Sequence, residues 1–474
     1  MNLKDKFPTN DPITQILHKI ANVAHKFETE IYLVGGAVRD KIMERESTDI
    51  DICVIGNAIE FAEKFGDTVG KDKIVVYPKF GTAMVPFYNF VVEFATARSE
   101  QYEENSRKPI VTKGTLKDDL LRRDFTINAM AMSLNQDDMF DLIDEFEGLE
   151  DIDEYTIRTP LDPIETFSED PLRMLRAIRF ATQLNFRIEP ETFDAISEVK
   201  DRMKIISQER ITEELRKMMN SKFPPSQGFA LLKQCGLLEI ILPEIDCLEG
   251  IDQSKNYHHK DVFWHTLEVV DNVAKVSDKF ELRFAALVHD LGKPDTKQFI
   301  EGKGWSFHGH EVIGMHKVHR LCSRMKLPNK LRDYAKKMTR LHLRPIALSE
   351  EGVSDSAVRR LMVQAGEELE DLMILCRADI TSKNPAKVKQ YTSNFDRVED
   401  YIEQVEEKDK LRAFQSPVRG DEIMKEFNLT PGREIGIIKK ALEELILDCV
   451  IANEYEAVRE YMLEHKADFE KMIG

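Results

Sequence analysis

The sequence predicts an α+β domain at the N-terminus followed by domains made of helices alone. In the first ~150 residues, short runs rich in Val, Ile, Phe and Tyr are separated by Gly and Pro, which is typical of strands. From about residue 165 to the end, apolar residues recur at helical spacing, with Leu172, Leu175 and Ile178 as an early example. The 474 residues exceed what one hydrophobic core usually organises, so we expect three or more domains.

Composition indicates a soluble globular protein of a reducing compartment. Hydrophobic residues make up 42% and charged residues 32% of the chain, and no run of about 18 apolar residues predicts a membrane span. The first residues, MNLKDKFPTNDP, lack the apolar core of a secretory signal. The six cysteines form no C-x-x-C pair, so we expect reduced thiols and a cytoplasmic location.

The charge balance needs a local interpretation. The net charge of -18 argues, taken alone, against a polyanionic partner, because phosphate binding requires cations. Yet the stretch 316–345 carries ten Lys and Arg against one acid, Asp333. The stretch 107–123 carries six basic residues against Asp118 and Asp119. A solvated helix face explains one such run, whereas a polyanion held along basic patches remains the alternative.

The first domain is expected to contain five strands, and two carboxylates stand at the start of the second one. The expected strands are Ile31–Val34, Ile50–Ile55, Ile74–Val76, Thr82–Phe87 and Phe90–Thr96. Asp49 and Asp51 project to the same face because side chains alternate along a strand. Burying two like charges is costly unless a cation lies between them, and Mg²⁺ prefers such oxygen ligands.

Two further features fit phosphate chemistry at this strand. Glu93 lies on another expected strand and provides a third carboxylate, and metals held in this way assist phosphoryl displacement. Gly35 and Gly36 let backbone N–H groups approach a phosphate. A tight turn beside a polar strand end would explain D-x-D alone, but not the whole set.

These residues resemble a known family. The runs LVGGAVRD and TDIDI are similar to the head of the nucleotidyltransferases that build the CCA end of tRNA, in the bacterial and eukaryotic class that includes bacterial poly(A) polymerases. The later run RRDFTINAMA resembles the family's segment for ribose and triphosphate. The resemblance implies a mixed sheet with flanking helices, catalytic Asp49, Asp51 and Glu93, and Mg²⁺ on the two aspartates. The residues implied to bind the nucleotide are Gly35, Gly36, Arg39, Arg123, Asp124, Asn128, Asp170 and Arg173.

The run SEDPLRMLRAIRFA predicts a helix that selects the base. Ser168 is expected to cap this helix, and Asp170 and Arg173 share a face as i,i+3 neighbours. The carboxylate of Asp170 accepts hydrogen bonds and the guanidinium of Arg173 donates them. Together they complement the pairing edge of cytosine or adenine, and they do not complement that of uracil or guanine. A surface ion pair is the simpler explanation of the spacing. The resemblance instead implies a protein template for CTP and ATP, supported in the neck by Glu169, Glu209 and Arg210.

The sequence is compatible with more than one product of nucleotide addition by the head domain. Bacterial poly(A) polymerases usually carry a G-R-R-F stretch after the D-x-D strand, whereas the chain has Lys79-Phe80-Gly81-Thr82, closer to the CCA-adding pattern. The loop 98–114 has a length that fits addition of the final A. We expect CCA addition to the immature 3′ end of tRNA, with A-only or CC-only addition and poly(A) synthesis as alternatives.

A histidine-rich zone from residue 258 to 342 predicts a second metal site. Imidazole and carboxylate ligands suit Mn, Fe, Ni, Zn or Mg, although a lone buried His-Asp pair is more often structural. Gly292 is expected to end the helix that carries the His-Asp pair. The pattern H…HD…D, formed by His265, His289-Asp290 and Asp379, resembles the HD phosphohydrolase superfamily. By this resemblance, the substrates are phosphomonoesters or 2′,3′-cyclic phosphodiesters. The implied metal ligands are His265, His289, Asp290 and Asp379, with His308, His310 and His342 at extra polar positions of some members.

The resemblance covers nearly the whole chain and defines the expected domains. They are the head 1–155, a helical neck 156–225, body or linker helices 226–255, the HD domain 256–400 and a helical tail 401–474. Lys336, Lys337 and Arg340 are expected to face RNA. Two further alternatives are an HD-centred phosphohydrolase with a vestigial head and an RNA-binding protein without turnover.

Overall fold

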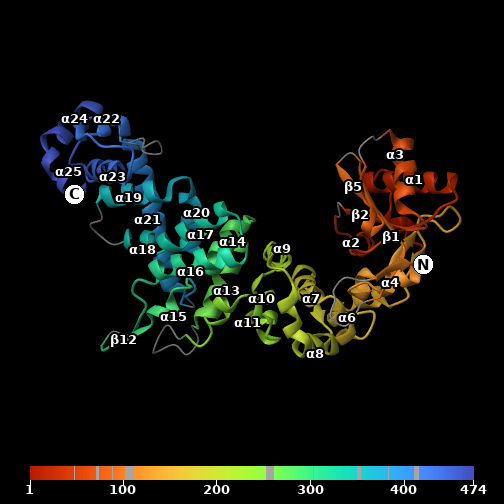
Figure 1. Cartoon of the computed structure of the whole chain (residues 1–474). Helices are drawn as coiled ribbons and strands as arrows, with labels where there is room; N and C mark the ends of the chain where they lie inside the picture. Colours follow the sequence, from red (N-terminus) through yellow and green to blue (C-terminus); the bar gives the residue numbers. More distant parts are fainter. Residues whose placement is uncertain are drawn as a thin grey trace. The chain divides into compact units, whose positions relative to one another are not determined.

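The chain folds into two compact units. The computed structural model describes residues 1–46, 49–70, 74–87, 89–101, 110–251, 261–302, 304–349, 354–382, 384–409 and 416–473. The units are Met1–Pro243 and Glu244–Gly474 (Figure 1). Strands dominate the start of the first unit and helices the rest of the chain, so the expected α+β head followed by helical domains is confirmed.

A seven-stranded mixed sheet forms the centre of the head. Its strand order is β3-β4-β5-β2-β1-β8-β9, and within it β2 and β5 run parallel whereas the other neighbours are antiparallel. The strands are β1 (Glu30–Val34), β2 (Asp49–Ile55), β3 (Val75–Tyr77), β4 (Thr82–Phe87), β5 (Phe90–Thr96), β8 (Ala131–Ser133) and β9 (Leu142–Ile143). The five expected strands are all present, each within a residue of its expected bounds.

Alternation along β2 explains how one strand serves both core and site. Ile50 and Ile52 are 1% exposed, whereas Asp49 is exposed and Asp51 is half-buried. Burial of the isoleucines sets the register of β2, because a slip by one residue would turn the aspartates into the core. Packing of these isoleucines in the core therefore keeps both carboxylates on the opposite face of β2.

Helices and a hairpin complete the head. Helix α3 (Ala58–Val69) packs on β4 and β5, where Phe61 and Phe65 each lie 5.4 Å from the ring of Phe94. The hairpin of β6 (Arg98–Gln101) and β7 (Ile110–Lys113) occupies the predicted loop 98–114, of which 102–109 lie outside the described residues. The other head elements are η1 (Lys4–Lys6), α1 (Pro12–Lys26), α2 (Gly36–Ile42), η2 (Pro78–Phe80), α4 (Leu116–Leu121), η3 (Thr126–Asn128) and α5 (Gly148–Asp153).

The first unit continues as short helices with one small sheet. Helix α7 packs against α9 and α10, and the parallel strands β10 and β11 lie beside it. The elements are β10 (Thr156–Ile157), α6 (Pro163–Glu169), α7 (Leu172–Leu184), β11 (Arg187–Ile188), α8 (Pro190–Val199), η4 (Lys200–Ile205), α9 (Gln208–Met219), α10 (Ser226–Gln234), α11 (Leu237–Ile241) and α12 (Pro243–Asp246).

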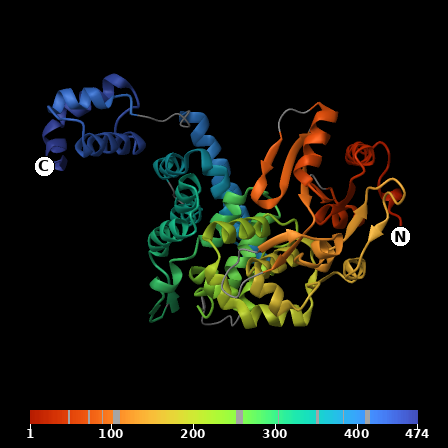
Figure 2. The ribbon, with the colours of Figure 1, turned by 45° about the vertical axis from the view of Figure 1, so that its right-hand side comes forward.

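The second unit is helical apart from one hairpin, β12 (Gln298–Ile300) and β13 (Gly304–Ser306). Figure 2 shows the long helix α21 (Pro385–Asp409), in blue, leading toward the C-terminal helices, which enclose a core of their own around Ile438 and Leu442. The other elements are α13 (Val262–Ala274), α14 (Phe280–Val288), α15 (Lys293–Thr296), α16 (His310–Arg324), α17 (Asn329–Leu341), α18 (Arg344–Ala347), α19 (Asp355–Ala365), η5 (Gly366–Glu368), α20 (Leu369–Ala378), α22 (Gly420–Phe427), α23 (Arg433–Leu447), α24 (Tyr455–Glu464) and α25 (Lys466–Ile473).

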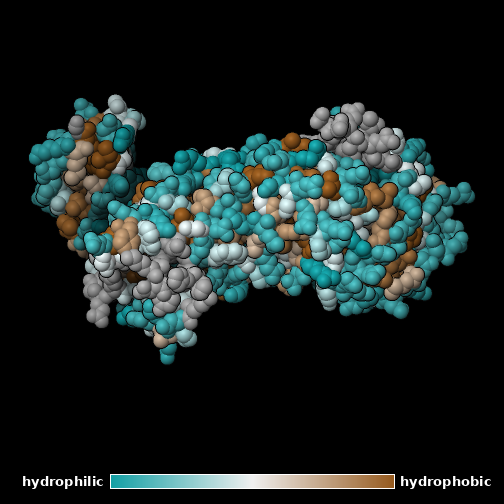
Figure 3. Space-filling model, turned by 90° about the horizontal axis from the view of Figure 1, so that it is seen from below, coloured by the Kyte–Doolittle hydropathy of each residue, from teal (hydrophilic) through white to brown (hydrophobic). Residues whose placement is uncertain are grey.

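Within the described part of the chain, no helix combines the length and the apolar character needed to cross a membrane. On the face drawn in Figure 3, apolar residues are interspersed with hydrophilic ones.

Candidate active sites

The parallel pairing of β2 with β5 brings three carboxylates together in the head. Asp51 stands directly opposite Glu93 in the register, and Asp49 lies two residues earlier on the same face of β2. Burial and then the neighbouring Asp49 raise the pKa of Asp51, although Arg123 opposes this shift. Burial followed by Asp51 raises the pKa of Glu93. These carboxylates do not readily ionise at the same time. Such a group fits a site for a divalent cation, because the cation would remove the repulsion between them.

The glycine turn after β1 touches this carboxylate group. Gly35 has a φ of 73°, in the left-handed region, and a Cβ there would lie 2.7 Å from Nη1 of Arg123 and 3.8 Å from Oδ2 of Asp51. A side chain at Gly35 is therefore excluded by both space and conformation. Gly36 begins α2, and a Cβ there would meet Arg39 at 3.4 Å, which is a tight but tolerable contact.

A buried polar network connects the turn with the RRDF segment. Arg39 donates through Nη1 to Oδ1 of Asn128 at 2.6 Å and also binds Asp40. Asn128 in turn donates to Oδ1 of Asp124 at 3.0 Å. Burial opposes ionisation of Asp124, but the guanidinium of Arg176, 2.6 Å away, lowers its pKa to about 2. The three predicted nucleotide-binding residues of this network thus hold one another.

Sequence reasoning missed several members of this network. Arg176 follows Arg173 by one helical turn, and Arg179 follows by another and pairs with Glu214 at 2.5 Å. Asp119, which is 2% exposed, holds both Arg122 and Arg123. The i,i+3 and i,i+4 spacing of Asp119 to the two arginines was a usable signal. The partner of Arg179 lies 35 residues away and left no signal in the sequence.

The residues predicted to select the base, Asp170 and Arg173, stand at a break between two helices, where one helix was predicted to begin at Ser168. That prediction is wrong, because Ser168 lies inside α6, which ends at Glu169, and α7 begins only at Leu172. Asp170 occupies the break with extended backbone. Pro171 occupies the N-cap position of α7, and its fixed φ is compatible with a helix that begins at the next residue.

Neighbouring groups hold the side chains of Asp170 and Arg173. Oδ2 of Asp170 accepts a bond of 3.1 Å from Arg210 of α9. Arg173 donates to the backbone oxygen of Arg122 at 2.6 Å and lies 3.4 Å from Glu169. The structure thus places Asp170, Arg173, Glu169 and Arg210 in one cluster, and Glu209 precedes Arg210 on α9.

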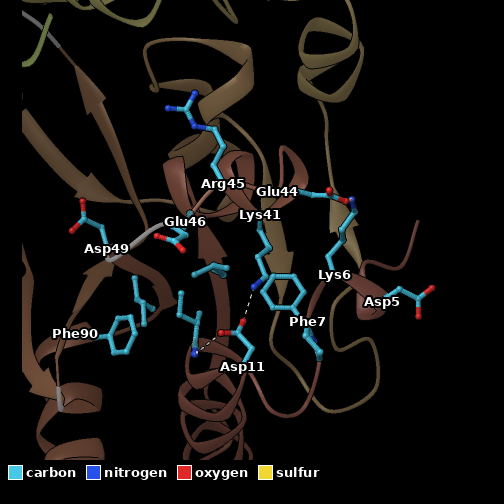
Figure 4. Close-up of a pocket in the computed structure, with 15 residues that line it drawn as sticks. Asp5, Lys6, Phe7, Asp11, Lys41, Glu44, Arg45, Glu46, Asp49 and Phe90 are labelled. Atoms are coloured by element: carbon cyan, nitrogen blue, oxygen red, sulfur yellow. Dashed lines mark hydrogen bonds and ion pairs between the residues drawn. The ribbon is translucent and has the colours of Figure 1, made fainter. Parts of the chain in front are cut away.

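A pocket of about 580 Å³ adjoins one end of the carboxylate group. Figure 4 shows Asp49 at its edge, opposite Lys41, which bonds to Asp11. Of the predicted catalytic and nucleotide-binding residues, only Asp49 lines it. The pocket also reaches Leu33 and Ala37, on either side of the Gly35-Gly36 turn, but not the side chains of the buried network described above.

A second carboxylate and imidazole cluster lies in the second unit. His265 comes from α13, His289 and Asp290 follow α14, and Asp379 follows α20. Nε2 of His265 lies 2.8 Å from Oδ1 of Asp379 and 3.5 Å from Oδ2 of Asp290. Nε2 of His289 lies 3.2 Å from Oδ2 of Asp290 and 3.6 Å from Oδ1 of Asp379. All four predicted ligands are thus brought together.

This cluster fits a metal ion on structural grounds. His265, His289 and Asp379 offer ligand atoms that lie within 4.8 Å of one another. Nε2 of His289 and both carboxylate oxygens of Asp290 are buried, and their contacts are ion pairs, of which the shortest joins Oδ2 of Asp290 to Nζ of Lys293 at 2.5 Å. Burial opposes protonation of His289, yet Asp290 raises its pKa to about 10. The site therefore concentrates negative charge that a cation would neutralise.

The three histidines predicted at additional polar positions of the HD domain differ in burial. His310 and His342 are buried beside Asp290, whereas His308 is exposed. Gly292 was expected to end α14, but α14 ends at Val288. Gly292 directly precedes α15 with a φ of −82°, which does not require glycine. A Cβ on Gly292 would overlap the backbone oxygen of His310 and come within 2.7 Å of the nitrogen of Gly314. Glycine is needed here because α16 must approach closely.

The predicted RNA-facing side chains share α17, and acidic neighbours accompany them. Nζ of Lys337 lies 2.6 Å from Glu368, and Nη1 of Arg340 lies 2.8 Å from Glu311. Lys336 lies 3.9 Å from Asp333. The three basic residues line one pocket of about 420 Å³ together with Arg344. The basic character of this run is thus partly neutralised within the fold.

The fold and these two sites define a metal-dependent nucleotidyltransferase head joined to an HD-type metal domain. Three family models match: "Poly A polymerase head domain" over residues 31–158, "Probable RNA and SrmB-binding site of polymerase A" over 185–248 and "HD domain" over 262–384. A "Multifunctional CCA protein" of Shewanella frigidimarina is 33% identical over 76% of the chain and 86% of its own length.

Two solved structures resemble the chain. A tRNA nucleotidyltransferase complexed with a primer tRNA and an incoming ATP analog is 25% identical, with a TM-score of 0.58 over 80% of the chain and 98% of its own. An apo CCA-adding enzyme, 24% identical, shares the fold with a TM-score of 0.65 over 98% of the chain and 99% of its own. The chain belongs to the family of CCA-adding tRNA nucleotidyltransferases with a fused HD domain, and it is an enzyme.

Proposed function

We propose that the head adds C, C and A to immature tRNA 3′ ends, using CTP and ATP without a nucleic-acid template. The observation that carries this proposal is the register of Asp51 against Glu93, with Asp49 on the same face and the Gly35 turn beside them. The relative with tRNA and an ATP analog bound supports the choice of substrates. We place the reaction in the cytoplasm, since all six cysteines are unpaired.

The three carboxylates would hold Mg²⁺. When bound, such ions stabilise the attacking and leaving oxygens of a phosphoryl transfer. The 3′-hydroxyl oxygen bonds to the α-phosphorus, the bond to the pyrophosphate breaks, and the hydroxyl proton passes to water. Backbone N–H groups at Gly35 and Gly36 and the guanidinium of Arg123 bind the triphosphate. Arg39 is buried and acts by positioning Asn128.

The cluster around the helix break chooses the base. Asp170 accepts from the amino group of cytosine or adenine, and Arg173 donates to the neighbouring ring nitrogen. Uracil and guanine offer the reverse pattern, which leaves Asp170 and Arg173 unpaired and is penalised by ~1–3 kcal/mol per buried group. Glu169 and Arg210 hold these two side chains in place through the contacts described above, and Glu209 supports the neck beside them.

A single extension experiment tests this proposal. tRNA transcripts that end before the CCA, or after CC, are incubated with the full-length protein, Mg²⁺ and one or all four nucleotides. The products are then resolved on a sequencing gel. The proposal predicts addition of C, C and A followed by a stop. A long A ladder would identify a poly(A) polymerase instead, and addition of A alone or of CC alone would identify a narrower enzyme.

The HD domain supports a second activity, metal-dependent hydrolysis of a phosphomonoester or a 2′,3′-cyclic phosphodiester. The observation that favours it is the convergence of buried imidazoles and carboxylates, with the ligand atoms of His265, His289 and Asp379 within 4.8 Å of one another and Asp290 beside them. His265, His289, Asp290 and Asp379 would hold a divalent transition metal or Mg²⁺. Hydrolysis of a 2′,3′-cyclic nucleotide in the presence of Mn²⁺ or Ni²⁺ tests it, and absence of turnover with any divalent ion would contradict it.

The basic face of α17 completes the proposal. Lys336, Lys337 and Arg340 would contact tRNA phosphates through the pocket that they line. Their acidic partners restrict how many of these contacts form, because each ion pair must open first.

A further inference from the structure

The face of the head sheet that carries the carboxylates continues from them to the edge strand β3. In the register of the sheet, Asp51 pairs with Glu93, Glu93 pairs with Met84, and Met84 pairs with Val75. Residues directly opposite each other on neighbouring strands project to the same face. One row of side chains therefore runs from β2 across β5 and β4 to β3, and only its first two members are charged.

A second row on the same face is apolar beyond its first member. Asp49 pairs with Val91 of β5, and Val91 pairs with Pro86 of β4. Val75 and Val91 are 46% and 47% exposed, Pro86 is exposed and Met84 is half-buried. Together the two rows present four apolar side chains to solvent directly beside the carboxylates.

Helix α4 covers a different part of this face. Leu120 of α4 packs with Tyr32 of β1 and Cys53 of β2 in one buried cluster. The uncovered part is thus the part that borders the carboxylates. It is apolar, although the solvent-facing side of a sheet usually carries polar side chains.

The stereochemistry of the proposed reaction decides which substrate meets these side chains. The pyrophosphate would leave toward Arg123 and the Gly35 turn, which follows β1 on one side of β2. The attacking and leaving oxygens of a phosphoryl transfer lie roughly in line. The 3′-hydroxyl that attacks therefore reaches the carboxylates from the other side of β2, across β5, β4 and β3.

We propose that Val75, Met84, Pro86 and Val91 form an acceptor surface, on which the 3′-terminal nucleotides of the acceptor RNA lie. The inference deepens the proposed nucleotide addition and rests on it. Nucleobases have flat apolar faces, and contact with such a surface removes them from water. The terminal base of the acceptor differs among the three additions of the proposed reaction. Apolar side chains do not read the edge of a base, so the acceptor surface accepts each terminus in turn.

Photocrosslinking tests this placement. In the full-length protein, a photoreactive benzophenone amino acid replaces Val75, which lies two strands away from Glu93. The variant is irradiated with tRNA that ends before the CCA, and the crosslinked nucleotides are identified by mass spectrometry. We expect crosslinks to the 3′-terminal nucleotides. The same amino acid in place of Tyr155, which is 63% exposed but outside this face of the sheet, should give none there.

The possible results separate this inference from the proposed activity. Suppose that the wild-type protein extends the tRNA, but that the variant crosslinks only to other parts of the RNA or to a second copy of the chain. This result would overturn the acceptor surface and leave CCA addition in place. Crosslinks to the 3′ end without extension would keep the acceptor surface and reject the catalytic proposal. Absence of both would reject both.

Kinetics provides a second test that does not depend on crosslinking. The triple variant Val75→Thr, Met84→Gln and Val91→Thr makes the acceptor surface polar with little change in size. The KM for tRNA should rise about tenfold because apolar contact is lost, whereas kcat and the KM for CTP should stay within about twofold. Val276→Thr, at an exposed valine of the second unit, is the control and should leave both KM values unchanged. An unaltered KM for tRNA in the triple variant, or a loss confined to kcat, would contradict the proposal.

Discussion

The head and the HD domain build metal-type sites in opposite ways. In the head, oxygen ligands from two strands lie at the rim of a sheet, where Asp49 is exposed and Asp51 is half-buried. In the HD domain, imidazoles and carboxylates from separate helices meet in the interior, and His289, Asp290 and His342 are at most 1% exposed. An open set of carboxylates leaves positions for substrate phosphates, whereas a buried mixed set offers most of its candidate ligands from the protein.

This difference indicates what determines the affinity of each site for a metal ion. In the proposed reaction, the open site would depend on the nucleotide for further oxygen ligands, so a metal there is expected to arrive with the substrate. The buried site presents its ligands before any substrate arrives, and its metal is expected to remain through desalting. Four predictions test this contrast, in order of decreasing effect.

The largest expected effect comes from removing one carboxylate from each site. Asp51→Asn should lower nucleotide addition by about a thousandfold, because a bound metal contributes several kcal/mol of transition-state stabilisation. It should leave HD hydrolysis unchanged, and Asp290→Asn should do the reverse. Steady-state assays of both activities on both variants measure this. Loss of both activities in either variant would show that the sites are not independent.

The next effect concerns the close approach in the HD domain. Gly292→Ala should destabilise the second unit by about 1–3 kcal/mol or more, because the added methyl group overlaps the backbone of His310. Urea unfolding followed by tryptophan fluorescence reports this unit, since both tryptophans, Trp264 and Trp305, belong to it. Gly436→Ala on α23 is the control, because nothing lies within 4 Å of its added carbon and stability should not fall. Equal stability of the two variants would contradict the close approach.

A comparable effect is expected in the head network. Arg176 holds the pKa of Asp124 at about 2, so ionised Asp124 stabilises the head by about 2 kcal/mol at neutral pH. Because this pKa is lowered, the stabilisation is present above a pH of about 4 and disappears as the pH falls toward 2. Asp124→Asn should remove it, and hydrogen exchange of head peptides between pH 7 and pH 3 measures the change. A variant with unaltered protection at pH 7 would contradict this pairing.

The smallest effect tests whether the second unit also contacts RNA. The triple variant Lys336→Ala, Lys337→Ala and Arg340→Ala should reduce the salt slope of tRNA binding by up to about 2–3, since each phosphate contact contributes about 0.9. Lys330→Ala, on the exposed start of the same helix, serves as the control and should leave the slope nearly unchanged. An unaltered slope in the triple variant would confine RNA binding to other surfaces.

Local patterns predicted the strands of the head but not how they pair. Runs rich in Val, Ile and Phe located β2 and β5, and the alternation of side chains along a strand placed Asp49 and Asp51 on one face. The parallel register that sets Asp51 against Glu93 depends on sheet order, which no local pattern carries. Network partners such as Arg176 and Glu214 escaped notice because their contacts join segments far apart in sequence.

Two local signals were misinterpreted for physical reasons. Ser168 has the chemistry of a helix cap, yet the proline two residues after Glu169 restarts the helix at Leu172 instead. Gly292 follows an apolar helix and was taken as its end, whereas its importance lies in helix packing. The sequence shows that a glycine is present, but only the fold shows which of its properties is used.

The order of the segments along the chain has a consequence for synthesis on the ribosome. β2 emerges first, β5 follows about 40 residues later, and α7 with Arg173 comes about 120 residues after Asp49. At about 5–20 residues per second, roughly 6–25 s separate the first carboxylate from Arg173. A truncated product that ends between β9 and α6 therefore contains all three carboxylates and neither of the residues predicted to select the base.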